Sequence, residues 1–529
     1  MLTHSLPLLA PIALAVTAGL IAKGQAQTPE RAALWGERAG LAGLGLALAS
    51  LALLIAFGPG ASPLLGLFGV GVSVRLDPVS VTMLLLVSFI GWVVLRYART
   101  YLDREPGQAR FTIWLLATLV AVMLLVQAGN LVLFTAAWIG SSLCLHKLLL
   151  FYPDRIAAQR GAHKKFVTAR ISDASLILAA VLLIATYGST DIGTILTLAH
   201  SGQGGIMAGL AAGLLALSAL LKSAQFPTHG WLTEVMETPT PVSALLHAGV
   251  VNAGGFLLIR FADVMLLSPF VLALLVMIGG FTALFGGLIM LTQPAVKTSL
   301  AWSTVGQMGF MILQCGLALF PLALLHIVAH SLYKAHAFLS SGGAVERVAA
   351  INRPGPVAVP NGGAVSRAFL AALGIYTAVF ALFGLVFGFD GKSPQAIALG
   401  AILIFGVAYL LAQGLADTAP RALTRRTSAY SAGAAISYFA LQRVAEWLTA
   451  GTLPLTPPPG PLEWALITLA LFSFGLVALA QATFPLWSNH PAAEGLRVHL
   501  ANGLYANAVM DRLLGGWRRV SPSKSGASK

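Results

Sequence analysis

Ionisable side chains stand beside helix-breaking prolines in residues 218–249, SALLKSAQFPTHGWLTEVMETPTPVSALLHAG, inside an otherwise apolar part of the chain. A lysine in the middle of a lipid-facing span costs roughly 2.5–3.5 kcal/mol, so Lys222 should face a wet interior. Pro227 interrupts the same apolar run and frees backbone groups, which transporters tolerate where the backbone lines a polar cavity. We therefore predict that the charge of Lys222 is switched beside the break. The alternative, that Lys222 extends to the cytoplasmic interface, is weaker because the predicted span continues to residue 237.

Three more ionisable residues fall on one face of a predicted helix in the segment HIVAHSLYKAH. His326, His330 and Lys334 are spaced by four residues, which places them one helical turn apart, whereas His336 faces elsewhere. A histidine titrates near neutral pH, and a desolvated lysine can release its proton. A single intramembrane histidine usually serves packing, but three ionisable groups in a row favour a proton path. A zinc site is the rival interpretation, and it is weak because no Glu or Cys stands at ligand spacing.

Other ionisable residues are candidates for the same path. His247 follows TPTPVS, one to two turns into a helix that the prolines of this motif start well. Asp173, in ARISDAS, lies one turn into its predicted span and is a candidate counter-charge for Lys222. Glu234 and Glu237 are expected at the membrane interface as accessory groups.

Membrane helices must position these residues. The 529-residue chain is 57% hydrophobic and only 9% charged, whereas soluble domains carry about 25% charged residues. Many apolar runs reach the ~20 residues needed to cross a bilayer. We predict an all-α polytopic membrane protein of about fifteen transmembrane helices, one of them broken within 205–237. The predicted spans are 6–22, 39–57, 79–95, 111–128, 130–151, 170–187, 205–237, 241–262, 268–291, 298–317, 320–345, 366–388, 394–415, 428–448 and 461–485.

The distribution of basic residues orients these spans. Lys and Arg gather in odd-numbered loops, while even-numbered loops such as 188–204 and 449–460 contain none. Because cytoplasmic loops carry the excess of positive charge, the N-terminus is expected outside and the C-terminus in the cytoplasm. The first apolar run is preceded by no Lys or Arg, so it is expected to be retained as a span.

Composition also argues against other classes of protein. The formal net charge of +14 comes from scattered basic loops and not from a basic patch interleaved with aromatics, so a nucleic-acid partner is not expected. Cys144 and Cys315 lie in apolar runs and indicate neither a disulfide framework nor a metal site. No Gly-rich nucleotide loop or cysteine cluster indicates a cofactor. A quinone- or haem-binding redox subunit remains an alternative, although histidines four residues apart on one helix do not bracket a haem.

Longer motifs resemble one family. KSAQFPTHGWLTEVMETPTPVSALLHAG, AWSTVGQMGFM followed by HIVAHSLYKAHAFLSSG, and VRLDPVSVTMLLLVSFIGWVVLRYARTYL resemble the antiporter-like proton-translocating subunits, which include subunit L of respiratory complex I and the large subunit of multi-subunit Na+/H+ antiporters. The resemblance covers about residues 70–350. Within that superfamily, METPTPVSALLHAGVVNAGGFL and the late motif HLANGLY most resemble the membrane subunits of the DAB inorganic-carbon accumulation complexes of autotrophic bacteria.

The resemblance implies an organisation and a set of roles. It implies two inverted five-helix repeats, at 111–262 and 263–415, between N-terminal helices at 1–110, C-terminal helices at 416–487 and a cytoplasmic tail at 488–529. It also implies that Lys222 is the central lysine of the first repeat, that His247 helps to link the repeats, and that His326, His330 and Lys334 carry the central relay. A soluble, zinc-bearing partner resembling carbonic anhydrase would lie on the cytoplasmic face.

Two departures from the family pattern weaken the expectation of a complete pump. The family usually has a glutamate after the tryptophan of the fifth span, but Ile139 follows Trp138 here, and His146 is the nearest ionisable replacement. The twelfth predicted span has no charged residue where complex I subunits place one. We therefore expect a reduced cation path, for protons or Na+, that drives uptake of CO2 or bicarbonate. A proton-pumping subunit of a complex I-like enzyme or of an antiporter, and a passive scaffold, are the alternatives.

Overall fold

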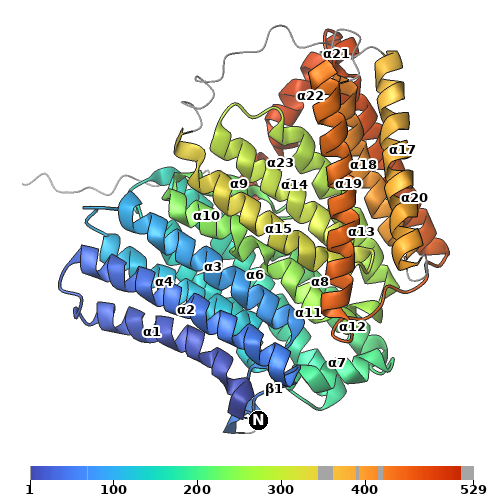
Figure 1. Ribbon diagram of the computed structural model, residues 1–529. Coiled ribbons are helices and arrows are strands. Elements are labelled where there is room, and N and C mark those ends of the chain that lie inside the picture. The colour runs from blue at the N-terminus through green and yellow to red at the C-terminus, as the bar shows by residue number, and fades with distance from the viewer. Residues whose placement is uncertain (1, 68, 344–361, 389–391, 415–420, 514–529) are drawn as a thin grey trace, which may run out of the picture.

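The computed structural model describes residues 2–67, 69–343, 362–388, 392–414 and 421–513 (Figure 1). These residues form an all-α bundle with four short strands near the N-terminus. The helices up to the middle of the chain are α1 (Leu9–Ala22), α2 (Pro29–Phe57), α3 (Pro78–Tyr101), α4 (Gln108–Val126), α5 (Leu131–Leu149), α6 (Ile156–Tyr187), α7 (Ile192–His200), α8 (Gly205–Lys222), α9 (Gly230–Thr233), α10 (Thr240–Ala248), α11 (Ala253–Arg260) and α12 (Ala262–Leu266). The later helices are α13 (Pro269–Met290), α14 (Val296–Gly316), α15 (Phe320–Leu339), α17 (Gly362–Phe387), α18 (Pro394–Gly414), α19 (Arg421–Thr449), α20 (Pro461–Ala482), α21 (Phe484–Trp487), α22 (Pro491–Ala501) and α23 (Ala506–Leu513).

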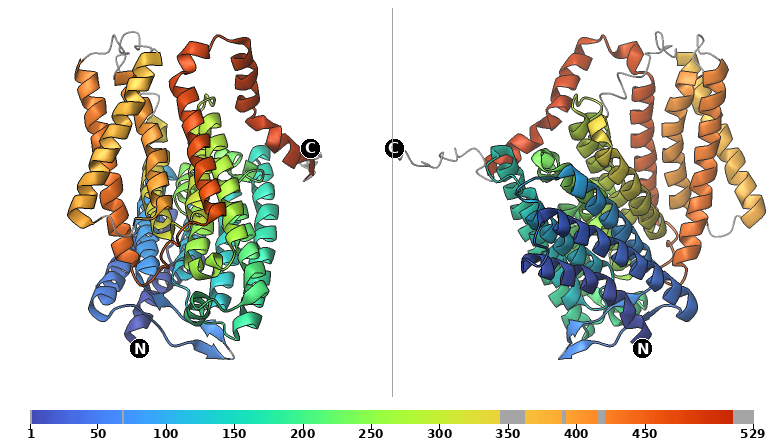
Figure 2. Two further views of the ribbon diagram at one scale, coloured as in Figure 1. Left: turned by 90° about the vertical axis from the view of Figure 1, so that its right-hand side faces the viewer. Right: turned by 60° about the vertical axis from the view of Figure 1, so that its left-hand side comes forward.

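The strands form two small antiparallel pairs between α2 and α3. They are β1 (Gly60–Ala61) with β4 (Arg75–Leu76), and β2 (Leu65–Leu67) with β3 (Val70–Val72). The end of the bundle that carries these strands, α7 and α12 is called the strand end below. The opposite end carries α9, and the C-terminal helices α21–α23 leave α20 and turn across it (Figure 2). This second end is called the tail end.

Twelve helices among the described residues are long and apolar enough to cross a membrane. The three other predicted spans fall on α14, α18 and α19, which do not meet both conditions over their described residues. α6 begins at Ile156, well before its predicted start at residue 170, so it carries basic residues into the bundle that we had assigned to a loop. The chain is therefore a multi-pass membrane protein.

Side-chain caps and prolines set where several helices begin. Asp77 accepts a hydrogen bond from Ser80 N at 2.7 Å to start α3, and Asn130 accepts one from Leu133 N at 2.8 Å to start α5. Such caps satisfy backbone donors that the first turn leaves free. Proline occupies an early position of α3, α13, α15 and α20, where its missing N–H costs nothing.

Helix α15 lies at the centre of the bundle. It packs against α3, α10, α11 and α14 on one side and against α19 on the other. Figure 1 shows α1–α4 on one flank of it and the group α17–α20 on the opposite flank. Its neighbour α14 is held unusually close to α13 through glycines, because a Cβ on Gly309 would lie 2.4 Å from Ala283 N and one on Gly286 would lie 2.5 Å from Gly306 N. Small residues allow such close packing of membrane helices.

Two consecutive predicted spans are broken in the structure, and the sequence predicts only the first of these breaks. α8 ends at Lys222, and the turns α9 and η2 (Val235–Glu237) replace a continuous helix up to residue 237. The next predicted span, 241–262, is broken too, because the 3-10 turn η3 (Val250–Asn252) separates α10 from α11. We had predicted that second span as continuous. Gly254 explains part of its geometry, since a Cβ there would lie 2.4 Å from both Ala219 O and Ser223 Oγ of the α8 segment.

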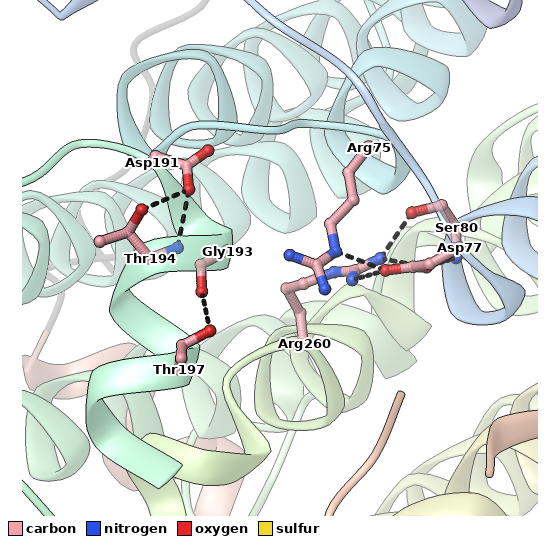
Figure 3. A network of polar contacts seen from close by, with 8 residues as sticks. All are labelled: Arg75, Asp77, Ser80, Asp191, Gly193, Thr194, Thr197 and Arg260. Carbon is pink, nitrogen blue, oxygen red and sulfur yellow. Dashed lines mark hydrogen bonds and ion pairs between the residues drawn. The ribbon is translucent and has the colours of Figure 1, made fainter. Parts of the chain in front are cut away.

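An ion-pair network locks the strand end (Figure 3). Asp77 Oδ2 accepts hydrogen bonds from Arg75 Nε and Arg260 Nη1, each at 2.6 Å, and Arg260 Nη2 also donates to Ser80 Oγ at 2.7 Å. Burial alone would raise the pKa of Asp77, but the two guanidinium groups outweigh it and hold that pKa well below its usual range. In the same view Asp191 caps α7 by accepting from Thr194 N at 2.7 Å. The network ties the start of α3 to the end of α11.

Candidate functional site

Lys222 lies where α8 breaks, and only 5% of it is exposed. Its Nζ donates to Trp138 O of α5 at 3.4 Å and stands 4.4 Å from the centre of the Trp138 ring. The broken backbone beside it is held by Ser223 Oγ, which donates to Val251 O at 2.8 Å. An aromatic face and a carbonyl oxygen can hold an ammonium group without neutralising it. Lys222 is therefore positioned as a buried cation with no carboxylate within ion-pair distance among the described residues.

Asp173 does not form the direct pair with Lys222 that we had considered. Its Oδ2 lies 2.6 Å from Nη2 of Arg170, one turn earlier on the same helix. Asp173 and Lys222 lie on helices α6 and α8, which pack against each other. That interface is fixed by two hydroxyl groups, because Ser172 Oγ donates to Ser218 O and Ser218 Oγ donates to Ser172 O, each at 3.0 Å.

A second buried lysine, Lys165, lies near Lys222 and was not among the predicted site residues. Lys165 is 4% exposed, and its Nζ donates to Ser142 O at 2.6 Å and to Ser142 Oγ at 2.9 Å. The predicted spans 130–151 and 170–187 leave Lys164 and Lys165 in a loop, but both lie inside α6. Lys222, Asp173, Arg170 and Lys165 are referred to below as the first cluster. One feature of the sequence could have indicated the burial of Lys165. No Gly or Pro separates it from the apolar span that begins near residue 170, so the helix can extend back to include it.

The accessory residues gather at the tail end. Lys164 Nζ lies 2.5 Å from Glu234 Oε1 and 2.5 Å from Asp511 Oδ1 of α23, so it joins α6 to two other segments. Glu237 pairs with Arg155 at 3.1 Å and is half exposed. Glu234 and Glu237, which we expect at the membrane interface, thus both have ion-pair partners.

His146 lies at the same end, in the last turn of α5. Its ring centre is 5.2 Å from that of Phe166. Its Nδ1 is buried without a hydrogen-bond partner among the described residues. A cleft of about 290 Å³ runs along it, lined by His146, Leu150, Gln159, Ala162, His163 and Phe166.

The predicted stripe His326, His330 and Lys334 lies along α15 and is called the central stripe below. The ring centres of His326 and His330 are 5.9 Å apart, and Lys334 is fully buried. Lys334 Nζ donates to Leu300 O of α14 at 3.0 Å. The four-residue spacing thus places the three groups on one face, as the sequence indicated.

His247 joins the broken helix α10 to the central stripe. His330 Nε2 is 3.2 Å from His247 O, and His247 Nδ1 is 3.1 Å from Thr304 Oγ1. Thr304 Oγ1 donates to Leu300 O at 3.0 Å, the same carbonyl that Lys334 uses. The His247 ring stacks on Phe338 with centres 4.3 Å apart. A connected polar network therefore links α10, α14 and α15.

Space for water adjoins the central stripe. A cavity of about 620 Å³ is bordered by His326, His330, Gln307, Gln314 and Tyr438, together with apolar residues of α15, α18 and α19. His326 Nε2 and Gln314 Oε1 are buried without hydrogen-bond partners among the described residues. The cavity is lined mainly by apolar side chains, so a water that satisfies these two atoms must lie at its polar edge.

A second, larger cavity opens at the strand end. It measures about 860 Å³ and is lined by charged residues that include Arg75, His200, Asp263, Arg443 and Glu446. Leu322 of α15 borders both this cavity and the one at the central stripe, and only 4% of it is exposed.

Taken together, these groups can carry protons but are poorly suited to bind a metal cation. The first cluster contains three basic groups and one carboxylate, and the central stripe contains only basic groups. Lysine and histidine accept and release protons, whereas Na+ needs oxygen ligands and is repelled by ammonium groups. The two groups of residues lie on separate helices, and the end of α8 contacts the turn after α10 through the hydrogen bond from Ser223 Oγ to Val251 O.

Comparisons with known proteins show which families this chain resembles. Residues 128–353 match the family described as NADH:quinone oxidoreductase/Mrp antiporter, TM, and residues 64–112 match NADH-Ubiquinone oxidoreductase (complex I), chain 5 N-terminus. The chain is 40% identical over 457 residues to the "Probable inorganic carbon transporter subunit DabB2" of Halothiobacillus neapolitanus, covering 85% of this chain and 81% of that protein. It is 46% identical over 275 residues to the corresponding DabB subunit of Hydrogenovibrio crunogenus, covering 52% of this chain and 53% of that protein.

A solved structure has a similar fold. A chain of the Mrp complex from Dietzia sp. DQ12-45-1b superimposes with a TM-score of 0.61 and 24% sequence identity. The match covers 97% of this chain and 61% of the Mrp chain.

Proposed function

This chain belongs to the DabB family of inorganic-carbon transporter subunits, and we propose that it translocates protons to drive inorganic-carbon uptake by a larger complex. The observation that carries the proposal is the central stripe beside its cavity. His326 borders that space, its buried Nε2 has no protein partner among the described residues, and His330 continues into the network of His247. Such groups buried in a membrane protein have a large cost that a transport role explains.

The cavities suggest a route for the proton. It enters at the strand end through the cavity lined by Arg75 and Asp263, passes Leu322, and reaches His326. His330, His247 and Lys334 then connect the route to the interior of the bundle, and the first cluster leads on to the tail end. In this proposal Leu322 separates two wet spaces and prevents a continuous leak of protons.

The topology and the repeats are part of the proposal. Fifteen spans would result if α14, α18 and α19 cross the membrane together with the twelve apolar helices. The strand end would then face outward and the tail end the cytoplasm. We assign the two five-helix repeats to 111–262 and 263–415, with N-terminal helices at 1–110, C-terminal helices at 416–487 and the tail at 488–529.

The energetics permit this coupling. One proton that moves through ~150 mV releases roughly 3.5 kcal/mol. A tenfold concentration ratio costs about 1.4 kcal/mol, so one proton can sustain a gradient of order a few hundredfold. We propose that the hydration chemistry belongs to a soluble, zinc-bearing partner that resembles carbonic anhydrase and docks at the cytoplasmic face.

The test is uptake of labelled inorganic carbon by the whole complex, in cells that lack their own accumulation system. Lys222→Ala and Lys222→Arg should both reduce uptake to background at matched membrane abundance, because arginine does not release its proton in proteins. Lys23→Arg is the matched control, since Lys23 is exposed between α1 and α2. Uptake should stop on addition of a protonophore and continue in Na+-free medium. Full uptake by the Lys222→Arg complex would exclude proton release at this site, and a strict Na+ requirement would overturn the choice of ion.

A further inference from the structure

We propose that Lys165 is a second proton-carrying lysine, which receives protons from or delivers them to the cytoplasm on behalf of Lys222. The inference rests on the proposed function and adds a residue and an access route to it. Its basis is the position of Lys165 between the cleft beside His146 and Lys222.

The surroundings of Lys165 distinguish it from an ordinary structural lysine. Its ammonium group is buried, and its partners are the carbonyl and hydroxyl oxygens of one residue, Ser142. No carboxylate of the described residues lies within ion-pair distance of its Nζ. Its neighbour Lys164 is different, because Glu234 and Asp511 both neutralise it. Of these two consecutive lysines of α6, Lys164 is paired with carboxylates and Lys165 is bound only by uncharged oxygens.

Helix α5 holds Lys165 and Lys222 along one line. Lys222 binds Trp138 O, and Lys165 binds Ser142 O, which is four residues later on α5. One helical turn separates these carbonyls by about 6 Å along the axis, a gap that one or two waters span. Ile139, where the family resemblance led us to expect a glutamate, adds no charge to this line. A lysine from α6 thus stands one turn away from the position where a carboxylate was expected.

The cleft at the tail end reaches the neighbours of Lys165. Ala162 and Phe166, which precede and follow it on α6, both line the cleft, as does His146 of α5. The Nδ1 of His146 is buried without a partner among the described residues, so a small rotation of the ring is needed to bring it to water in the cleft. The charged and titratable groups whose charges act on Lys165 are Lys222, Asp173, Arg170 and Cys144, and Lys165 in turn acts on His146.

The proton step follows from this arrangement. The ammonium form of Lys165 transfers one proton through water to the neutral amine of Lys222, which becomes ammonium. Neutral Lys165 then takes one proton from water in the cleft, and the reverse order serves transport in the other direction. The transfer between the two lysines leaves the net charge of the first cluster unchanged. The uptake of one proton from the cleft then raises that net charge by one. Asp173 offsets part of that charge.

Arginine substitution separates a proton-carrying role from a structural one. Lys165→Arg keeps the positive charge and donors for Ser142 but does not release a proton, so inorganic-carbon uptake by the whole complex should fall at least about tenfold. Lys165→His, which can titrate, should retain part of the uptake with a changed pH profile. Lys147→Arg is the matched control, because Lys147 is an exposed lysine on α5. Near-normal uptake by Lys165→Arg at matched abundance would overturn the inference.

The accessibility of introduced cysteines tests the water route from the cleft to position 165 without a measurement of transport activity. Cys144 and Cys315 are first replaced by serine, and Lys165→Cys or Ser218→Cys is then added. A small charged methanethiosulfonate reagent applied from the tail side should modify the cysteine at position 165 and not that at 218, which is fully buried between α6 and α8. Equal protection of both positions would overturn the access route.

The two levels of proposal fail in different ways. If a protonophore does not reduce inorganic-carbon uptake by the unsubstituted complex, the proposed function fails. If Lys222→Arg abolishes uptake while Lys165→Arg does not, the proposed function stands and only the role of Lys165 is lost.

Discussion

Asp77→Asn is expected to destabilise the strand end strongly while leaving helix α3 capped. Asparagine caps helices about as well as aspartate, so the hydrogen bond to Ser80 N survives the change. What disappears is the negative charge that two arginines share. Arg260 has a side chain only 3% exposed and loses its counter-ion, whereas Arg75 is 25% exposed and can turn to water.

The burial of each partner sets the expected magnitude. Leaving a buried charge unpaired costs about 3–5 kcal/mol of unfolding free energy, which is the value we expect for Asp77→Asn. Arg75→Gln removes a partly exposed partner and should cost no more than about 1 kcal/mol. The double variant Asp77→Asn with Arg260→Gln removes both buried charges, so it should be more stable than Asp77→Asn alone.

Unfolding is followed by titration with sodium dodecyl sulfate in mixed micelles. Cys315 is fully buried and serves as the reporter, since it reacts with a thiol dye only after unfolding, in a background where Cys144 is serine.

The loss of unfolding free energy in Asp77→Asn should be constant from about pH 6 to 8. A carboxyl with a lowered folded pKa contributes its stability above its unfolded pKa, about 4, and loses it as pH falls through the folded value. Asp77→Asn with the stability of Arg75→Gln, or a double variant no better than the single one, would refute this reasoning.

Three further predictions concern the path, the topology and the tail. Loss of His330 alone should reduce uptake nearly as much as loss of the whole central stripe, because groups that act as one relay give non-additive effects; roughly additive partial losses with poor stability would indicate packing instead. A cysteine placed in α23 should react with a membrane-impermeant thiol reagent only in inside-out vesicles, and efficient labelling of intact cells would reverse the proposed orientation. Asp511→Asn should release the C-terminal helices from Lys164 at a cost of up to about 1 kcal/mol, seen as faster proteolysis within α22 and α23, while Glu494→Gln, on an exposed residue of α22, should not.

Much of the architecture could be predicted because apolar runs and helical spacing are local properties. The membrane class and the resemblance to antiporter-like and DAB subunits are confirmed by the comparisons. Each predicted span coincides with helical segments, although the span 241–262 is broken and only twelve helices of the described residues meet the conditions for a membrane span. The break after Lys222 and the single face of the central stripe also followed from the sequence, because prolines and four-residue spacing act within one helix. The roles of the site residues remain predictions.

What the sequence determined, then, was which side chains could carry a proton and on which helices they lie, since composition and periodicity are written along the chain. Which of them meet was decided only by the tertiary structure. Asp173 pairs with Arg170 and not with Lys222, Lys164 is neutralised by Asp511 from the far end of the chain, and Lys165 is buried against Ser142. These outcomes depend on how far α6 extends and on how closely α5, α6 and α8 pack. Such packing reflects contacts summed over whole helix faces, which no short stretch of sequence records.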